Sequence, residues 1–384
     1  MKTAAFAVLL FFGVLTLWVQ ERWAWSLFQT GIFALAGRCV WEARRLPVSP
    51  PLALLGAAAL WPWVQVGLGT TFSRGATLDA AFDWFTFFLV FAVGFNILGD
   101  PARRRWFLHL AVVFGMLVAL LALLQQHTSG GKVFWIFPSG FPDDVLGPFV
   151  NRNQYAAWVE LLLPLALYEA ATNRAYRFAA MAAAATLFGS VVASASRAGF
   201  VLASLEIAAA ITLLLVRRML PRRAVWQILA LVAVAAVAAG WQELHHRFAS
   251  PATENLRIDA ARASLLMVRA HPLCGFGLGT WPVIYPRYAS FDSGLFLNQA
   301  HNDWLQWAAE GGVPFFLFLL GFTALLWKRA IPSIYGLGTV SILVHALVDY
   351  PMQQRPALAA WFFAFAAAAM SETREITKYR CAKP

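Results

Sequence analysis

The feature that most limits the fold of this chain is a series of apolar segments, each about 18–22 residues long, the length that spans a bilayer core of ~30 Å. Charged residues make up only 13% of the 384 residues and hydrophobic residues 60%, whereas soluble domains usually carry about 25% charged residues. This composition excludes a cytosolic enzyme, a disordered protein and a secreted disulfide scaffold. We predict an all-α, polytopic integral membrane protein, a single transmembrane domain over 1–384 with about 12 transmembrane helices. The predicted segments are 3–20, 23–41, 50–68, 80–99, 106–126, 153–171, 176–194, 198–216, 224–241, 308–327, 332–350 and 356–371.

Lys and Arg residues in the connections predict the orientation, because cytoplasmic loops of membrane proteins carry an excess of them. With the N-terminus inside, 19 of the 30 Lys and Arg residues fall in inside connections, and every inside connection is basic. Both termini are therefore expected in the cytoplasm. The net charge of +11 then reflects topology, so we expect membrane lipids as partners and no nucleic acid.

The longest outside connection is 242–307, and long loops cross the membrane regardless of their charge. No small-x-small cleavage site follows the first apolar segment, so we interpret 3–20 as a retained span and not as a signal peptide. In this topology only Cys274 of the three cysteines faces outside, and no internal disulfide is expected.

Polar residues gather directly before the segment 153–171. Gly147-Pro148 leads into a cluster of amides around Arg152 and Asn153. The cluster is either a polar helix cap or a surface that binds a polar head group. Glu160 lies about two helical turns further on, within the apolar layer, where a carboxylate usually faces a protein interior or a cavity.

Four arginines on the outside need a further explanation. Arg197 lies in the tight hairpin between two segments, and its side chain either extends to the interface or points inward, where its planar fork suits a phosphate. Arg257, Arg262 and Arg269 lie on a predicted helix over 255–270, and the last two share one face.

A glycine-rich segment, Gly275-Phe-Gly-Leu-Gly279, follows this helix. It lacks the strand, βαβ unit and downstream acid of a dinucleotide fingerprint. A glycine-rich loop beside three arginines is nevertheless suited to a close approach to a diphosphate.

The fourth motif is His301-Asn302-Asp303, followed by Glu310 and a glycine pair. His301 begins a predicted short helix, whose dipole disfavours the protonated ring and leaves a neutral imidazole that can accept a proton. A structural role for a single histidine is the alternative. Glu310 is a candidate for orienting the ring, and His271, which precedes Pro272, is expected to shape its loop.

Metal-binding patterns are weak in this chain. It has no HExxH or Cys-x-x-Cys motif, and Asp143-Asp144 is the one candidate acid pair. We expect no metal and no cofactor.

The ordered set of motifs resembles the superfamily of O-antigen ligases and O-antigen polymerases of bacterial inner membranes. Four parts carry the resemblance: Gly147-Pro148-Phe149 with Asn151-Arg152-Asn153-Gln154; Ser196-Arg197-Ala198-Gly199; Arg257 with His271-Pro272-Leu273 and Gly275-Phe276-Gly277; and His301-Asn302-Asp303-Trp304-Leu305 with Glu310-Gly311-Gly312. Ala261 departs from the pattern, since members often have an aromatic residue there.

The resemblance implies a GT-C-like membrane glycosyltransferase. Such enzymes move a glycan from undecaprenyl diphosphate to a glycan or lipid A-core acceptor at the periplasmic face, with inversion and without a metal. By position, Arg197 and Arg257 would hold the diphosphate, and His301 would be the base. The other expected substrate contacts are Arg152, Asn153, Glu160, Arg262, Arg269, Asn302, Asp303 and Glu310.

Several alternatives stay open. A transporter or flippase of lipid-linked or polar substrates would also have many spans and charges within the membrane, although it would typically show internal repeats. A polymerase of a different lipid-linked glycan would share the chemistry. Within the superfamily, the sequence does not separate ligase, polymerase and protein O-glycosyltransferase.

Overall fold

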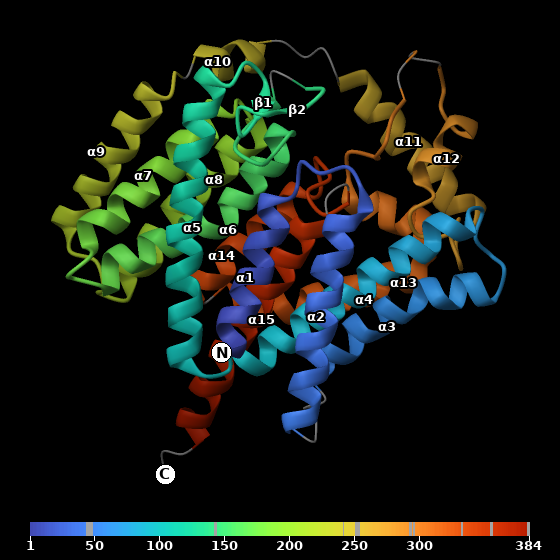
Figure 1. The fold of residues 1–384 in the computed structure, drawn as a ribbon, viewed down its shortest axis with the longest axis horizontal. Coiled ribbons are helices and arrows are strands. Elements are labelled where there is room, and N and C mark those ends of the chain that lie inside the picture. The colour runs from blue at the N-terminus through green and yellow to red at the C-terminus, as the bar shows by residue number, and fades with distance from the viewer. Residues whose placement is uncertain are drawn as a thin grey trace.

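The computed structural model describes residues 1–384 apart from 44–48, 142–143, 241, 250–253, 292–293, 295, 332, 354–355 and 382–384. These described residues form fifteen α-helices and one two-stranded antiparallel sheet (Figure 1). The sheet pairs β1 (Lys132–Val133) with β2 (Phe137–Pro138). The predicted all-α class is therefore confirmed.

Each of the twelve predicted apolar segments corresponds to a helix. The helices are α1 (Lys2–Leu15), α2 (Arg22–Ala43), α3 (Pro50–Gly67), α4 (Arg74–Ile97), α5 (Pro101–Thr128), α6 (Arg152–Thr172), α7 (Arg177–Ala193), α8 (Arg197–Val216), α9 (Arg222–Ala238), α13 (Asp303–Ala330), α14 (Ile334–His345) and α15 (Pro356–Cys381). The predicted tight hairpin between the seventh and eighth segments is the turn that joins α7 to α8.

Twelve membrane crossings are not confirmed, however. Among the described residues, four helices are long and apolar enough to cross a bilayer, namely α4, α5, α8 and α13. The number is five if α9 and the bent continuation α10 (Gln242–Ala249) form one span. Helix α1 has only 14 residues, so at ~1.5 Å per residue it is about 21 Å long, shorter than a bilayer core of ~30 Å.

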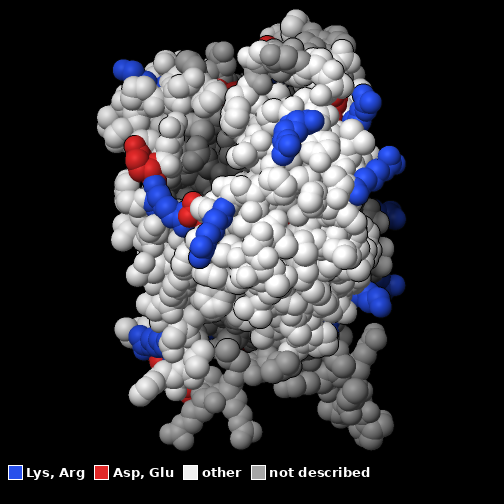
Figure 2. All heavy atoms as spheres, turned by 90° about the vertical axis from the view of Figure 1, so that its right-hand side faces the viewer, with Lys and Arg blue, Asp and Glu red and all other residues white. Residues whose placement is uncertain are grey.

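One large apolar core joins these helices. Helix α6 packs against α5, α7, α8 and α14, and α15 packs against α4, α13 and α14. Trp158 of α6 meets Trp361 of α15 edge to face with ring centroids 5.4 Å apart, and both indoles are fully buried. A run of buried alanines on α15 lets neighbouring backbones approach closely. On the face of the molecule seen in Figure 2, a broad area carries no charged side chains and has Lys and Arg around it, as expected for a surface against lipid.

The connection 242–307 has a small core of its own at the upper end of Figure 1. It contains α10, α11 (Glu254–Ala270), α12 (Trp281–Ile284) and the 3-10 helix η2 (Tyr285–Arg287). Buried Met267, Phe276 and Trp281 belong to this core, which also includes Ala309 of α13. Helix α1 begins and α15 ends at the opposite, lower end of the view. This shared core holds the connection against the N-terminal part of α13.

Candidate active site

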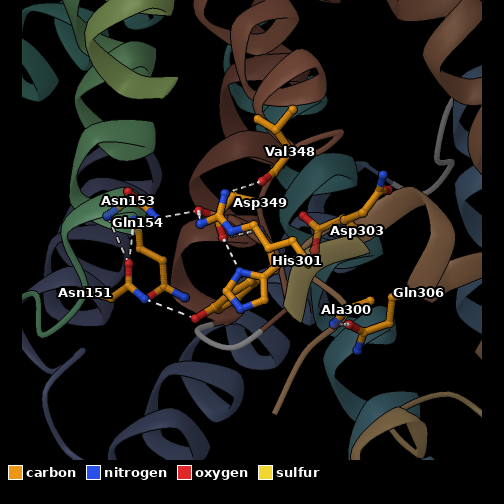
Figure 3. Close-up of polar contacts among 12 residues, drawn as sticks. Asn151, Asn153, Gln154, Ala300, His301, Asp303, Gln306, Val348 and Asp349 are labelled. Atoms are coloured by element: carbon orange, nitrogen blue, oxygen red, sulfur yellow. Dashed lines mark hydrogen bonds and ion pairs between the residues drawn. The ribbon is translucent and has the colours of Figure 1, made fainter. Parts of the chain in front are cut away.

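The loop between α14 and α15 brings three of the sequence motifs together at a single carboxylate. Asp349 accepts a short hydrogen bond from Asn153 Nδ2. Its Oδ1 lies 3.4 Å from His301 Nδ1, and its Oδ2 lies 3.5 Å from Arg257 Nη2. The side chain of Asp349 is only 5% exposed (Figure 3). We call residues 346–353 the Asp349 loop.

Two residues at the start of α13 hold the Asp349 loop in place. Asn302 caps α13 by accepting from Leu305 N, and its Nδ2 donates to Leu347 O at 2.8 Å. Asp303 is fully buried; its N–H donates to Ala346 O, and its Oδ2 accepts from Met352 N at 3.0 Å. Both were expected to contact substrate, and that expectation stays a prediction. Asn302 Nδ2, the Asp303 N–H and Asp303 Oδ2 hold the loop, whereas the buried Asp303 Oδ1 has no hydrogen-bond partner among the described residues.

His301 adopts a backbone conformation that is uncommon for residues other than glycine. Its φ is +52°, in the left-handed region. The following Asn302 cap and the preceding Ala300, whose N–H donates to Gln306 Oε1 at 2.9 Å, fix the chain on both sides of it. The ring meets Tyr350 edge to face at 4.7 Å and remains 28% exposed. Strain of this kind, over-determined by its surroundings, is common at functional sites.

The predicted amide cluster forms the N-terminus of α6. Asn151 is the N-cap, since its Oδ1 accepts from the backbone N–H groups of Asn153 and Gln154. Its Nδ2 donates to Tyr350 Oη at 3.2 Å. The cap interpretation therefore applies to Asn151 and not to Asn153, whose side chain is free to reach Asp349. Figure 3 shows Asn151 and Asn153 on the same side of Asp349, opposite Gln306.

Arg257 is the only one of the three α11 arginines that the described contacts join to the Asp349 loop. Its Nη1 donates to Val348 O at 3.2 Å, while its buried Nε has no hydrogen-bond partner among the described residues. The side chain is one-third exposed. Arg262 and Arg269 are exposed on the same helix. Arg257 thus keeps donors available for an anion that approaches the loop.

Helix α11 is held in position by Asp259. Its carboxylate accepts from Tyr285 Oη at 2.8 Å and from Ser290 N at 3.0 Å. Burial raises the pKa of Asp259, but these hydrogen bonds more than offset it, and the pKa lies below its usual range. Asp259 stays ionised and anchors the helix that carries Arg257.

Arg197 begins α8 directly after the tight turn from α7. In this turn Ala195 has a φ of +53°, and Ser196 Oγ caps α8 by accepting from Gly199 N at 3.2 Å. The guanidinium is half-buried. No hydrogen bond or ion pair of the described residues joins Arg197 to the Asp349 loop, although α8 packs against both α6 and α14.

The first part of the glycine-rich segment packs against the backbone of α13. Helix α13 breaks at Gly312, where φ is +71°, so carbonyls of the preceding turn lose their helical partners. The N–H groups of Phe276 and Gly277 donate to Ala309 O at 3.2 Å and Glu310 O at 2.9 Å. A Cβ on Gly275 would lie 2.3 Å from Glu310 O. The expected approach of this loop to a diphosphate is therefore replaced by packing against α13.

Glu310 supports the same contact. Its buried Oε1 accepts from Trp281 N at 2.9 Å and from Gln306 Nε2 at 3.2 Å. Glu310 was a candidate for orienting the ring of His301, but the carboxylate that lies next to this ring is Asp349. His271 is exposed, and its ring lies edge to face against Phe276, consistent with the expected role in shaping the loop.

Glu160 faces the protein interior, as expected from its depth, but it does not contact the Asp349 loop. It is fully buried; Ser341 Oγ donates to its Oε2 at 2.9 Å, and its Oε1 lies 2.8 Å from His345 Nδ1. The carbonyl of His345 accepts from Asp349 N at 3.0 Å. Glu160 is thus connected to the Asp349 loop through His345, and its expected contact with substrate stays a prediction.

Only one residue of the candidate acid pair for a metal lies within the described part of the chain. Asp143 lies outside the described residues, and Asp144 forms a short ion pair with Arg152. Arg152, expected to contact substrate, thus has a local partner that neutralises its charge.

The charges around Asp349 stabilise its ionised form. Burial raises its pKa, but the contact with His301 and the positive charge of Arg257 outweigh burial, and the pKa lies below its usual range. Burial and the neighbouring carboxylate raise the pKa of Tyr350, which stays neutral. The site therefore combines a fixed anion, a partly exposed imidazole and a guanidinium with free donors.

Sequence reasoning missed Asp349. It lies near the end of the apolar segment 332–350, shortly before the polar run Gln353-Gln354-Arg355. A carboxylate within an apolar segment is a signal of function, but this signal does not show which distant residues meet it.

Comparison with known families agrees with this resemblance. Residues 182–320 match the family model of the O-antigen ligase. The resemblance to the superfamily of O-antigen ligases and polymerases is confirmed. The matched segment includes Arg197, Arg257 and His301, whereas Asn153 and Asp349 lie outside it. The match supports a glycosyltransferase of the O-antigen ligase type at the level of the family, and the apolar helices indicate an integral membrane protein. No curated protein matches the chain.

Proposed function

We propose that this protein transfers a glycan from undecaprenyl diphosphate to an acceptor hydroxyl at the periplasmic face of the bacterial inner membrane. The reaction inverts the anomeric carbon and needs no metal. The O-antigen ligase match supports the class of reaction. The donor, the side of the membrane and the roles of the residues are our proposal.

His301 is the general base. It is partly exposed, so an acceptor hydroxyl can reach it, and its Nδ1 faces the buried carboxylate of Asp349. A carboxylate on one ring nitrogen fixes the tautomer, leaves the other nitrogen as acceptor and stabilises the imidazolium that forms. Asn153 completes the arrangement by holding Asp349 from the opposite side.

Arg257 and Arg197 bind the diphosphate. Arg257 carries a buried Nε without a described partner next to the base, and Arg197 lies half-buried at the start of α8. A guanidinium fork suits phosphate oxygens, and positive charge already in place stabilises the departing diphosphate in the transition state.

The reaction is a direct displacement at the anomeric carbon of the donor. The acceptor oxygen forms a bond to the anomeric carbon while its proton moves to His301. The bond from that carbon to the diphosphate oxygen breaks, and its electron pair leaves with the diphosphate. His301 later releases the proton to solvent.

The contact between His301 and Asp349, with Arg257 on the second carboxylate oxygen, is the observation that carries this proposal. The test measures transfer by the purified protein from a synthetic undecaprenyl-diphosphate glycan. His301→Ala is expected to lower the rate by ~10²–10⁴-fold while donor binding persists. His271→Ala, the matched control in the same outer region, should keep most activity. An active His301→Ala protein beside an inactive His271→Ala protein would reverse the assignment.

Gene deletion with glycan gel analysis separates the acceptor classes. Loss of long-chain glycan on lipid A indicates a ligase, whereas products with a single repeat unit indicate a polymerase.

A further inference from the structure

A cavity of about 270 Å³ lies next to the end of the Asp349 loop, where Met352 and Gln353 line it. The first half of α4, the segment 278–282 and the start of α13 form its other walls. A second cavity of about 330 Å³ adjoins it, since Asp79, Asp83 and Pro356 line both.

The walls combine hydrogen-bonding side chains with aromatic rings. Asp83, Glu310 and Gln299 provide acceptor oxygens, and Trp84 and Trp307 contribute indole rings. Gln306 also lines the cavity, and its amide holds Gln299 and Glu310 in place. Carboxylates and amides of this kind match the paired donor and acceptor of a sugar hydroxyl. None of the residues lining the first cavity is a Lys or Arg.

Gln353 is the second observation that points to a ligand. It lines the cavity, and its Nε2 is buried without a hydrogen-bond partner among the described residues. A buried donor left unpaired costs free energy, so a ligand with an acceptor oxygen would gain from meeting it once the Gln353 side chain turns towards the cavity.

The cavity adjoins the proposed base through the chain itself. Gln299 and Gln306, which lie on either side of His301 in the sequence, both line it, and Gln306 also accepts from Ala300 N. Figure 3 shows His301 between Asn151 and Asn153 on one side and Gln306 and Ala300 on the other. The base thus separates the cavity from the N-terminus of α6.

We infer that this cavity binds one sugar unit of the acceptor, a neutral or amino sugar, and presents one of its hydroxyls to His301. The inference rests on the proposed transfer reaction. The carboxylates of Asp83 and Glu310 disfavour uronic and phosphorylated sugars, because like charges repel at a partly desolvated site. Asp79 adds less to this repulsion, since it is paired with Arg22.

The test measures the binding of simple glycosides, so its result does not depend on glycan transfer. The full chain, purified in detergent, is titrated with the methyl glycosides of glucose, N-acetylglucosamine, glucosamine and glucuronic acid, and binding is followed by saturation-transfer NMR. Gln353→Ala and Asp83→Asn are the test variants. Glu243→Gln is the matched control, because Glu243 is an exposed carboxylate on α10, remote from the cavity in sequence.

At least one neutral or amino glycoside should bind the unaltered protein, with the glucuronide at least about tenfold weaker. Gln353→Ala should weaken neutral binding by about tenfold, and Asp83→Asn should narrow the gap between neutral and acidic glycosides. Glu243→Gln should change neither. Tighter binding of the glucuronide, no binding of any glycoside, or equal binding by Gln353→Ala and the control overturns the inference.

Transfer kinetics separate this inference from the proposed function. If the protein transfers glycan but Gln353→Ala leaves the KM for the acceptor unchanged, the cavity assignment fails and the function stands. If glycosides bind as expected but the unaltered protein transfers nothing, the function fails and the cavity remains a sugar site.

Discussion

Asp349 Oδ1 and His301 Nδ1 lie 3.4 Å apart, although 48 positions separate the two residues in the chain. The contact joins the loop after α14 to the residue that precedes the cap of α13. Because Asn302 and Asp303 bond to the same loop, the carboxylate and the ring cannot move independently. In the proposed reaction this contact would orient the ring of His301 and stabilise its protonated form.

Asp349→Asn removes the charge while keeping the shape. We expect the rate of transfer to fall by about 10²-fold or more, because the imidazolium loses its counter-ion and the ring its preferred tautomer. The KM for the donor should change little. Steady-state kinetics of the purified variant check this, with Asp144→Asn as a control carboxylate that pairs with Arg152 outside the Asp349 loop. Equal losses in both variants would contradict the role of Asp349.

Lysine at the two proposed diphosphate arginines keeps the charge but loses the planar fork. Arg257→Lys and Arg197→Lys are each expected to lower turnover by about a hundredfold, equivalent to ~3 kcal/mol of transition-state stabilisation. Arg287→Lys, at an exposed arginine of η2, is the control and should retain activity. Near-normal turnover of both test variants at matched expression would exclude these roles.

The low pKa of Asp349 also predicts a pH dependence of stability. Because the pKa is lower in the folded state than the usual ~3.9 of an unfolded Asp, ionised Asp349 stabilises the fold above about pH 4. That contribution is lost as the pH falls through the folded pKa. The difference in Tm between the unaltered protein and Asp349→Asn should be constant from pH 7 to about pH 5 and shrink towards pH 3. A difference that grows on acidification would show that the pKa is raised and not lowered.

The predicted topology can be tested with single cysteines in a background where the native cysteines are replaced by serine. Leu273→Cys lies in 242–307 and is 71% exposed, whereas Tyr176→Cys lies in a connection assigned to the inside and is 61% exposed. A membrane-impermeant maleimide should label the first in intact cells and the second only after lysis. The reverse pattern would invert the orientation.

Gly312 should tolerate no side chain. Its φ of +71° disfavours other residues, and a Cβ would lie 2.5 Å from Leu273 O. We expect Gly312→Ala to lower the Tm by several degrees and to reduce activity through the displaced loop. Gly37→Ala on α2, where a Cβ would meet nothing within 4 Å, is the matched control and should leave the Tm unchanged or slightly higher.

Helix positions were predictable because apolar runs and their Pro and Gly ends are local properties of the sequence. The segment 50–68, for example, corresponds closely to α3 (Pro50–Gly67). The role of Gly275 was not predictable in the same way. A glycine that admits a ligand and one that admits another backbone look identical in sequence, and only the break at Gly312 shows which applies here.

The sequence predicted several residues of the candidate site but not Asp349, the carboxylate at its centre. Arg257 and His301 stood out because ionisable residues were concentrated on the outside of the predicted topology. Asp349 did not, since a single carboxylate at the end of an apolar segment acquires its role only when distant segments converge on it. Asn302 and Asp303 were recognised, but their sequence position could not distinguish contact with substrate from support of a loop.

The break at Gly312 also divides α13 mechanically. Backbone and side-chain hydrogen bonds tie the outer part, which follows His301, to the segment 272–281 and to the Asp349 loop. The inner part, up to Ala330, continues as an apolar helix with exposed Val313, Leu317 and Leu320. A change in bilayer thickness is accommodated by tilting such a helix. We therefore expect tilting of the inner part to disturb the proposed base, His301, less than tilting of an unbroken helix would.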